Sequence, residues 1–555
     1  MPEAILPPTT AGIYPARFSD SYAPGRRTLL IALAIFLLTG LALRTNNLAA
    51  ESLSEDELNK LQTVAEYRAE GLTGRNGEHP FLMKGLQTMS IFAAEKWNAA
   101  ASMGWKIPDE AALRFPTALF GTLTALLIFF LVNELFGPAI ALISAALWAV
   151  DPNAIGFDRI AKEDSFLLFF FLLANIFWLR GQSRAERGAC DWQRYIWPAA
   201  VGFGAMLASK YLVHLFAVSI AYFEIFVGVS DRWRFGKARW IKFYALLGIS
   251  FVIFNPTILL PETWRQMLLF SGEKRIVHDA YEFAGTLYRN QISLWLAGVP
   301  WTFYYVFVLV KTPLLTLLCF FLGIPHLFRR KLGDGRFFIF FWAFMWFVPF
   351  TFLGGKFTRY FVVVEPLVLL TAAIGVYFSA KWLADRLPRA SLRRRRALVW
   401  SFPLILIAAA LGASLSAAPF YRLYHNPLTT GFYFPHDEFY DTSTRQIVAE
   451  IASRARPGAT VANETPYLFE YYGRQTGRAD LVYVSLSEKS KIADLAAGDF
   501  IVAARGRRYF SNDAYLQYLE SFAAPSAEIR IGRVTSAKIY QLDEATAARI
   551  RELAK

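Results

Sequence analysis

Long apolar runs recur along this chain and constrain its fold more than any other feature. Several have about 17 or more residues, close to the length that an α-helix needs to cross the hydrocarbon core of a bilayer. Charged residues make up only 18% of the sequence, against roughly 25% in soluble globular proteins. We therefore expect a polytopic α-helical membrane protein with about eleven spans, near residues 28–43, 111–136, 139–156, 164–180, 195–209, 211–229, 240–257, 312–328, 336–353, 360–380 and 397–418.

Clusters of basic residues between the apolar runs predict the orientation. The first run follows Arg26 and Arg27 and could pass for a signal peptide, but the long leader and the many later spans favour an uncleaved helix after a cytoplasmic segment 1–27. Four later loops carry the basic excess that is typical of cytoplasmic loops: Arg180/Arg184/Arg187/Arg194, Arg232/Arg234/Lys237/Arg239, Arg329/Arg330/Lys331/Arg336, and Lys381 with Arg393–Arg396.

This orientation assigns four segments to the outer face. They are loops 44–110, 157–164 and 258–311, and everything after residue 418. Within them, Phe81–Ala100 is partly apolar but contains Lys84, Glu95 and Lys96, so we expect it to lie along the interface. Segment 295–310 is predicted to be interfacial or re-entrant, because counting it as a span would move the last two basic loops outside.

The rest of the composition excludes several classes of protein. The net charge of +14 comes from short basic clusters between apolar runs, so we expect no binding to nucleic acid. Cys190 and Cys319 give neither a disulfide framework nor a metal signature. The sequence contains no nucleophile-elbow, zinc-protease or P-loop motif.

The character of the chain changes after the last apolar run. Residues 28–418 are the predicted membrane domain, and residues 419–555 alternate amphipathic helical stretches with short strand-like runs. This alternation predicts a small extracytoplasmic α/β domain. The expected strands are Ala459–Ala462, Leu481–Val484, Phe500–Ala503, Ile529–Val534 and Lys538–Leu542.

Two groups of carboxylates fall on the predicted outer face. Glu55, Asp56 and Glu57 follow the first span, where they could simply begin a helix or a solvated loop. Packed carboxylates raise one another's pKa, which suits a general base. Glu163 and Asp164 open the fourth span, where Asp164 could merely favour the helix dipole. Two acidic sites that converge from separate loops favour the functional interpretation.

Cations and histidines also reach this face. Lys84, Lys210 and Lys311 could each be ordinary snorkelling side chains. The segment Gly354–Tyr360 (GGKFTRY) is more specific, because its glycines allow close backbone approach and Lys356 with Arg359 suits a phosphate. Glu78 or His79 could hold a divalent metal together with His278, although no ligand spacing demands it.

Several short motifs, in their order along the chain, resemble the protein O-mannosyltransferase superfamily (glycosyltransferase family 39, GT-C fold), which includes bacterial lipid A aminoarabinose transferases. Asp56 and Glu57 stand where this family has an Asp-Glu pair in its first outer loop. His79–Lys84 (HPFLMK) is similar to the family segment His-Pro-Pro-Leu-x-Lys, with Phe81 in place of the second proline. Asp164–Leu167 (DSFL) resembles the second acidic motif of the family.

Three later segments strengthen the resemblance, which covers approximately residues 25–485. They are Ser209–Tyr211 (SKY), Lys311–Leu314 (KTPL) and Lys356–Tyr360 (KFTRY). The tail departs from the family, since it lacks the sugar-binding repeats of the eukaryotic mannosyltransferases. This departure affects the prediction of the acceptor more than the prediction of the reaction type.

The resemblance implies an inverting transfer of one sugar from a polyprenyl phosphate to an acceptor hydroxyl, at the outer face of a bacterial inner membrane. Asp56 would deprotonate the acceptor, Glu57 would tune or orient Asp56, and Asp164 would position the acceptor or the base. No cofactor is certain, and the acceptor remains a protein, a lipid or a glycan. The implied substrate-binding residues are His79, Lys84, Glu163, Lys210, Lys356, Arg359 and Tyr360.

Three other classes remain as alternatives. An oligosaccharyltransferase would carry a Trp-Trp-Asp-Tyr-Gly signature, which is absent here. A transporter or flippase would place its charges near the midplane, often in repeated halves, whereas this chain gathers its polar residues at one face. A membrane scaffold would give no reason for two acidic sites on the outer side.

Overall fold

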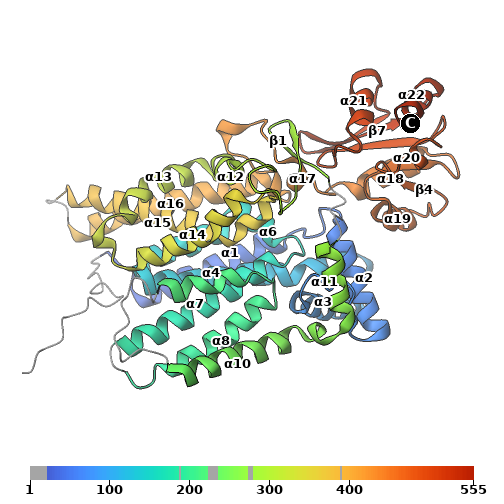
Figure 1. Cartoon of the computed structure of the whole chain (residues 1–555). Helices are drawn as coiled ribbons and strands as arrows, with labels where there is room; N and C mark the ends of the chain where they lie inside the picture. Colours follow the sequence, from blue (N-terminus) through green and yellow to red (C-terminus); the bar gives the residue numbers. More distant parts are fainter. Residues whose placement is uncertain (1–21, 187–188, 223–235, 273–278, 388–390, 555) are drawn as a thin grey trace, which may run out of the picture.

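The computed structural model describes residues 22–186, 189–222, 236–272, 279–387 and 391–554. Its larger part is a bundle of roughly parallel helices, and its smaller part is an α/β domain at one end of that bundle (Figure 1). The helices of the bundle are α1 (Arg26–Thr45), α4 (Asp109–Phe136), α5 (Pro138–Val150), α6 (Pro152–Asp158), α7 (Asp164–Glu186), α8 (Gln193–Leu207), α9 (Ala217–Tyr222), α10 (Gly236–Phe254), α12 (Phe303–Lys311), α13 (Leu314–Leu327), α14 (Gly335–Phe352), α15 (Glu365–Asp385) and α16 (Leu392–Ala417).

The apolar helices make this a multi-pass membrane protein. Within the described ranges, six helices are long and apolar enough to span a bilayer, and α5 with α6, which meet at 60°, can count as a seventh. The predicted number of about eleven spans is therefore not confirmed. Helix α13 has 14 residues, and part of the predicted span 211–229 lies outside the described residues.

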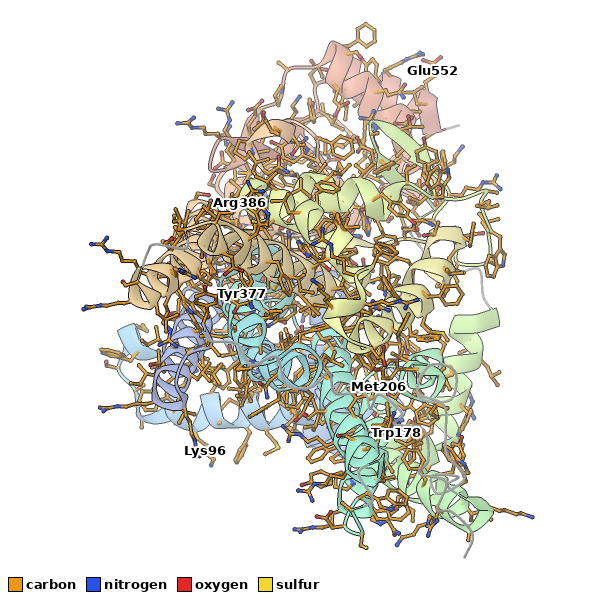
Figure 2. The ribbon with its side chains drawn as sticks, turned by 90° about the vertical axis from the view of Figure 1, so that its left-hand side faces the viewer. Lys96, Trp178, Met206, Tyr377, Arg386 and Glu552 are labelled. Atoms are coloured by element: carbon orange, nitrogen blue, oxygen red, sulfur yellow. The ribbon has the colours of Figure 1, made fainter. Side chains whose placement is uncertain are left out.

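The interior of the bundle is filled by large side chains. Trp178 on α7, Met206 on α8 and Tyr377 on α15 are buried, whereas Lys96 on α3 (Phe81–Ala100) and Arg386 after α15 lie at the surface (Figure 2). Helix α12 has nine residues and is too short to cross a bilayer alone, and the interfacial or re-entrant position of segment 295–310 stays a prediction.

Three helices, α2 (Glu55–Glu70), α3 and α11 (Pro261–Gly272), lie across one end of the bundle, next to the hairpin of β1 (Tyr281–Phe283) and β2 (Thr286–Tyr288) and the C-terminal domain (Figure 1). The segments that sequence parity assigned to the outer side therefore gather at one end of the molecule.

The C-terminal domain contains the predicted α/β fold. Its five-stranded sheet has the order β4-β3-β5-β7-β6, with β3 parallel to β4 and β5, and β7 antiparallel to β5 and β6. Its elements are α17 (Pro435–Glu438), α18 (Thr444–Arg454), β3 (Thr460–Asn463), α19 (Pro466–Gln475), β4 (Val482–Ser485), α20 (Lys489–Ile492), β5 (Phe500–Ala504), α21 (Asp513–Phe522), β6 (Ala527–Ile531), β7 (Val534–Gln541) and α22 (Glu544–Ala554).

One hydrophobic cluster joins this domain to the membrane part. Leu58 on α2, Ile91 on α3 and Leu113 on α4 belong to the same cluster as Val461 and Phe469 of the sheet domain. The C-terminal domain is therefore packed onto the end of the bundle where the candidate site lies.

Candidate active site

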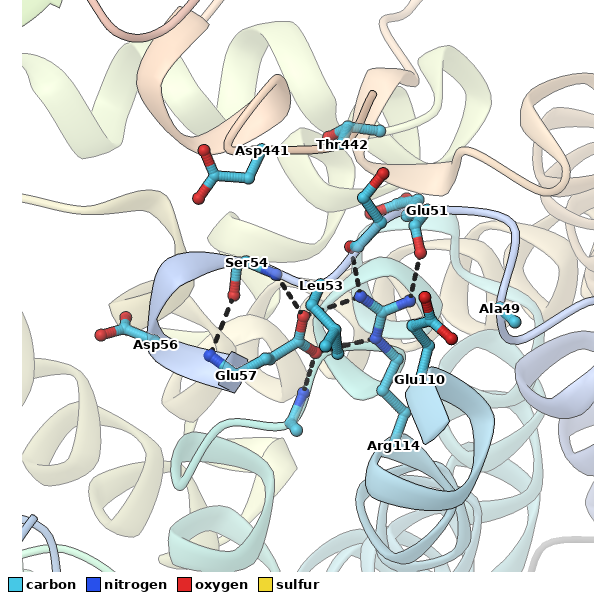
Figure 3. A network of polar contacts seen from close by, with 12 residues as sticks. Ala49, Glu51, Leu53, Ser54, Asp56, Glu57, Glu110, Arg114, Asp441 and Thr442 are labelled. Atoms are coloured by element: carbon cyan, nitrogen blue, oxygen red, sulfur yellow. Dashed lines mark hydrogen bonds and ion pairs between the residues drawn. The ribbon is translucent and has the colours of Figure 1, made fainter. Parts of the chain in front are cut away.

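The first turn of α2 is fixed by a buried ion pair. Ser54 caps the helix and forms a reciprocal capping box with Glu57. The Glu57 carboxylate accepts hydrogen bonds from Arg114 at 2.7 and 2.8 Å, and from the backbone N–H groups of Ser54 and Ala161, both at 2.9 Å (Figure 3). Although burial opposes ionisation, Arg114 and these hydrogen bonds lower the pKa of Glu57 to about 2. Glu57 is therefore an anchored anion.

Arg114 also fixes the chain that leads into α2. Its guanidinium donates to the carbonyl oxygens of Leu48, Glu51 and Ser52 at 2.6–3.1 Å. The segment between α1 and α2 is thus held against α4.

Glu55 is anchored in a different direction, by the C-terminal domain. Its backbone N–H donates to the Asp441 carboxylate at 2.9 Å, and its own carboxylate lies 3.2 Å from Arg507. Arg507 also pairs with Asp441. Asp56 lies between these two anchored neighbours and points away from the Glu57–Arg114 network (Figure 3). Its side chain is 27% exposed and forms an ion pair with Lys162.

The short segment between α6 and α7 brings the second acidic group to the same place. Lys162 contacts Asp56, Glu163 pairs with Lys60 at 3.2 Å and with His79 Nδ1 at 3.2 Å, and Asp164 pairs with Lys210 at 2.5 Å. Burial lowers the pKa of His79, and the surrounding cations hold that of Glu163 well below its usual value. The two acidic motifs are therefore joined through Lys162.

The predicted phosphate-binding cations differ in the groups that their side chains already contact. The Lys84 ammonium donates to the carbonyl of Asn76 at 2.7 Å, and that of Lys356 donates to the carbonyl of Leu353. Burial lowers the pKa of each lysine to about 8. Lys210 lies 4.5 Å above the Tyr360 ring, in addition to its ion pair with Asp164.

Arg359 stands apart from these lysines. Its guanidinium stacks over Phe357 at 4.4 Å and Tyr360 at 5.5 Å. No residue in the described part of the chain accepts a hydrogen bond from it or forms an ion pair with it. It lines a narrow pocket with Ser54, Phe157, Ile160, Lys162, Thr358, Arg422, Asp437 and Tyr440.

Sequence reasoning missed the contribution of the C-terminal segment to this pocket. Asp437 accepts a hydrogen bond from the backbone N–H of Thr358 at 2.9 Å and another from the Tyr281 hydroxyl. Burial raises the pKa of Asp437. Arg422, Asp437 and Tyr440 line the pocket and lie before β3, the first strand of the sheet. Only the acidic pair after Pro435 hinted at this role, and the predicted boundary at residue 419 assigned it to a separate domain.

Other missed residues are buried partners of predicted ones. Lys311 pairs with Glu438 at 2.9 Å, and Lys60 pairs with Glu163. For a metal, no group of three or more His, Cys, Asp or Glu side chains converges within the described ranges. Glu78 accepts a hydrogen bond from Asn76 at 2.7 Å, and His278 lies outside the described residues.

An apolar groove of about 550 Å³ lies between α7, α8 and α10. Its lining includes Phe170 and Phe177 of α7, Trp197 and Ala205 of α8, and Phe254 of α10. Asp164 begins α7, and Lys210 follows the end of α8. At about 1.5 Å rise per residue, Phe170 lies roughly 9 Å along the helix from Asp164. The groove thus begins close to the polar site.

Comparisons with known proteins give one local and one whole-chain likeness. Residues 96–259 match the family described as dolichyl-phosphate-mannose-protein mannosyltransferase. The structure of ArnT from Cupriavidus metallidurans bound to undecaprenyl phosphate is similar at a TM-score of 0.50 and 13% identity, over 93% of this chain and 98% of ArnT. The apo structure of the same protein gives a TM-score of 0.51 and 12% identity, over 92% and 98%. No curated protein sequence matches.

At this level of identity the likeness to ArnT concerns the fold, which extends over nearly the whole of both chains. The sequence match includes Asp164 at the start of α7 and Lys210, which follows α8. Together with the membrane helices and the small C-terminal sheet, these findings show that the chain has the fold of ArnT over most of its length and resembles the mannosyltransferase family over residues 96–259.

Proposed function

We propose that this protein transfers one sugar, with inversion, from a polyprenyl-phosphate donor to an acceptor hydroxyl at the outer face of a membrane. The observation that carries the proposal is the convergence of Asp56 and Asp164, which come from two distant outer segments, on one cluster of cations. Lys162 contacts Asp56 directly and interacts electrostatically with Asp164. Acids and cations at one rim of the bilayer suit a transfer whose leaving group is a phosphate.

In the proposed reaction, Asp56 removes the proton of the acceptor hydroxyl while the acceptor oxygen bonds to the anomeric carbon. The bond from that carbon to the phosphate oxygen breaks, and the polyprenyl phosphate leaves with the electron pair. Because the leaving group is already an anion, it needs cations rather than a general acid. Arg359 and Lys210 are the best candidates, since Arg359 lacks an ion-pair partner among the described residues.

The remaining predicted residues support the site. Glu57 is a positioning residue that fixes the first turn of α2, and Glu163 with His79 holds segment 160–164 against α2 and α3. Lys84 and Lys356 each donate a hydrogen bond to a backbone carbonyl oxygen and thereby stabilise the neighbouring loop. The ring of Tyr360 forms cation–π contacts with both Lys210 and Arg359.

The donor lipid would lie in the apolar groove between α7, α8 and α10, which begins near Asp164 and Lys210. The similar ArnT structure contains undecaprenyl phosphate, so a donor of this lipid class is consistent with the fold. We place the protein in a bacterial inner membrane with the site and residues 419–555 outside, and the acceptor is a protein, a lipid or a glycan.

The proposal is tested with protein reconstituted in nanodiscs and polyprenyl-phosphate sugars that carry a radiolabelled sugar. We expect the label to move to an acceptor in envelope extracts, and mass spectrometry of envelope glycans from cells with and without the gene then identifies that acceptor. In sealed vesicles, a transporter or flippase would move the labelled lipid across the bilayer without breaking its sugar–phosphate bond. That result would contradict the proposal.

The Arg359→Ala substitution is expected to weaken binding of undecaprenyl phosphate about 10- to 100-fold, the effect of losing a charge-assisted hydrogen bond. Binding is measured by microscale thermophoresis in nanodiscs. Arg329→Ala is the control, because Arg329 is exposed and follows α13 in a predicted cytoplasmic loop. Equal affinities for wild type and Arg359→Ala would move the phosphate site elsewhere.

A further inference from the structure

Lys162 holds an unusual place between the two halves of the proposed site. It lies in the short segment between α6 and α7, and its side chain is only 6% exposed. Its ammonium pairs with Asp56, and it lines the same narrow pocket as Arg359. One lysine thus contacts the proposed base and also faces the space proposed for the phosphate.

The surroundings of Lys162 carry an excess of positive charge on the pocket side. Burial, together with the nearby cations Arg359 and Lys210, lowers the pKa of Lys162 to about 7, and Glu163 with Asp164 opposes this decrease. The carboxylate of Glu163 is shared with Lys60 and His79, and that of Asp164 with Lys210. An anion that enters beside Arg359 would therefore meet one cation without an ion-pair partner among the described residues, Arg359, and a second, Lys162, that is shared with Asp56.

We propose that Lys162 is shared between two anions and thereby couples donor binding to activation of the base. This inference rests on the proposed function. Without donor, the ammonium neutralises Asp56. When the donor phosphate enters beside Arg359, the ammonium of the flexible side chain turns to the phosphate, and the Asp56 carboxylate is free to accept the proton of the acceptor hydroxyl.

The coupling explains why the base is paired in the empty site. A carboxylate held by an ammonium is a weak proton acceptor, because protonation would leave the cation without a partner. Moving the same cation to the phosphate stabilises the leaving group and strengthens the base in one step. Acceptor deprotonation is then favoured only when a donor is present.

Binding of undecaprenyl phosphate alone, without an acceptor, tests the shared role of Lys162. Asp56 and the phosphate compete for Lys162, so Asp56→Asn should tighten undecaprenyl phosphate binding about 3- to 10-fold, about half a unit to one unit in log Kd. Lys162→Met should weaken binding about tenfold or more, as expected for loss of a charge-assisted hydrogen bond. In the Lys162→Met background, Asp56→Asn should no longer tighten binding, because the shared cation is gone.

The measurement is the dissociation constant of undecaprenyl phosphate for the four proteins of this double-mutant cycle, in nanodiscs at one pH and salt concentration. Lys106→Met serves as the control, since Lys106 is an exposed lysine of loop 44–110, the predicted outer loop that also contains Asp56. If Asp56→Asn leaves the affinity for undecaprenyl phosphate unchanged, or raises it equally in the wild-type and Lys162→Met backgrounds, the proposal that Lys162 is shared is wrong. If Lys162→Met does not fold, the single Asp56→Asn measurement still decides. If wild type does not bind undecaprenyl phosphate at all, the proposed function fails instead.

Discussion

Replacement of Asp56 by asparagine is expected to reduce sugar transfer by about 10²-fold or more, the effect of losing a general base. Asparagine has nearly the same shape but cannot accept the proton of the acceptor hydroxyl. The neighbouring anchors of Asp56, the Glu57–Arg114 and Glu55–Arg507 pairs, do not involve its side chain. The first turn of α2 should therefore stay in place, and donor binding should become tighter. Transfer is measured as single-turnover release of labelled sugar from the polyprenyl phosphate.

The matched control is Glu70→Gln, which removes an exposed carboxylate from the last turn of the same helix. We expect its transfer rate to equal that of wild type. Near-normal turnover of Asp56→Asn would remove Asp56 from the role of base and leave Asp164 as the remaining candidate.

Substitution of Arg114 by methionine is expected to have the largest effect on stability. It leaves the Glu57 carboxylate buried without its cation, and breaking one side of a buried ion pair typically costs about 3–5 kcal/mol. Three backbone carbonyls between α1 and α2 also lose their donor. We expect a large fall in the melting temperature of the purified protein in detergent, measured by intrinsic fluorescence.

Arg68→Met is the comparison, because the Arg68–Glu95 pair lies on the surface with both side chains more than 40% exposed. Surface pairs contribute about 0–1 kcal/mol, so its melting temperature should be close to that of wild type. Equal effects of the two substitutions would show that the buried pair does not hold α2 in place.

The same ion pair predicts an acid-sensitive stability. The pKa of Glu57 is lowered from 4.5 to about 2 in the folded protein, so its contribution is complete above the unfolded value. That contribution declines as the pH falls from about 4.5 towards 2, because the unfolded chain then binds a proton that the folded chain excludes. Glu57→Gln should reduce the pH dependence of the melting temperature over this interval relative to wild type.

Much of the architecture could be predicted from the sequence because it depends on local patterns. Alternating helical and strand-like runs predicted the C-terminal sheet, and strands β3, β4 and β5 lie within about one residue of the predicted runs. The prediction Ile529–Val534 instead crosses the turn between β6 and β7, where Gly532 has a positive φ of 59°. Because only two residues separate β6 from β7, the hydrophobic pattern continues across the turn and does not indicate where one strand ends.

The span count was harder to predict for a related reason. Hydropathy detects apolar runs, but a break such as that at Asp151, whose side chain caps α6 next to Pro152, divides one run into two helices that meet at 60°. Helix length in the bundle is set by such caps and by packing between neighbours, which a sliding window does not register.

The sequence by itself predicted that acidic and basic groups gather at one end of the membrane domain, because charge and hydropathy act locally along the chain. The residue types alone did not distinguish Glu55, Asp56 and Glu57, three adjacent carboxylates of similar chemistry, and only the family resemblance favoured Asp56 as the base. Tertiary structure decided that question through Arg114 and Arg507, which lie 57 and 452 residues from their partners. An ion pair between distant residues exists only once the fold brings them together, and those two pairs leave Asp56 as the carboxylate that faces Lys162.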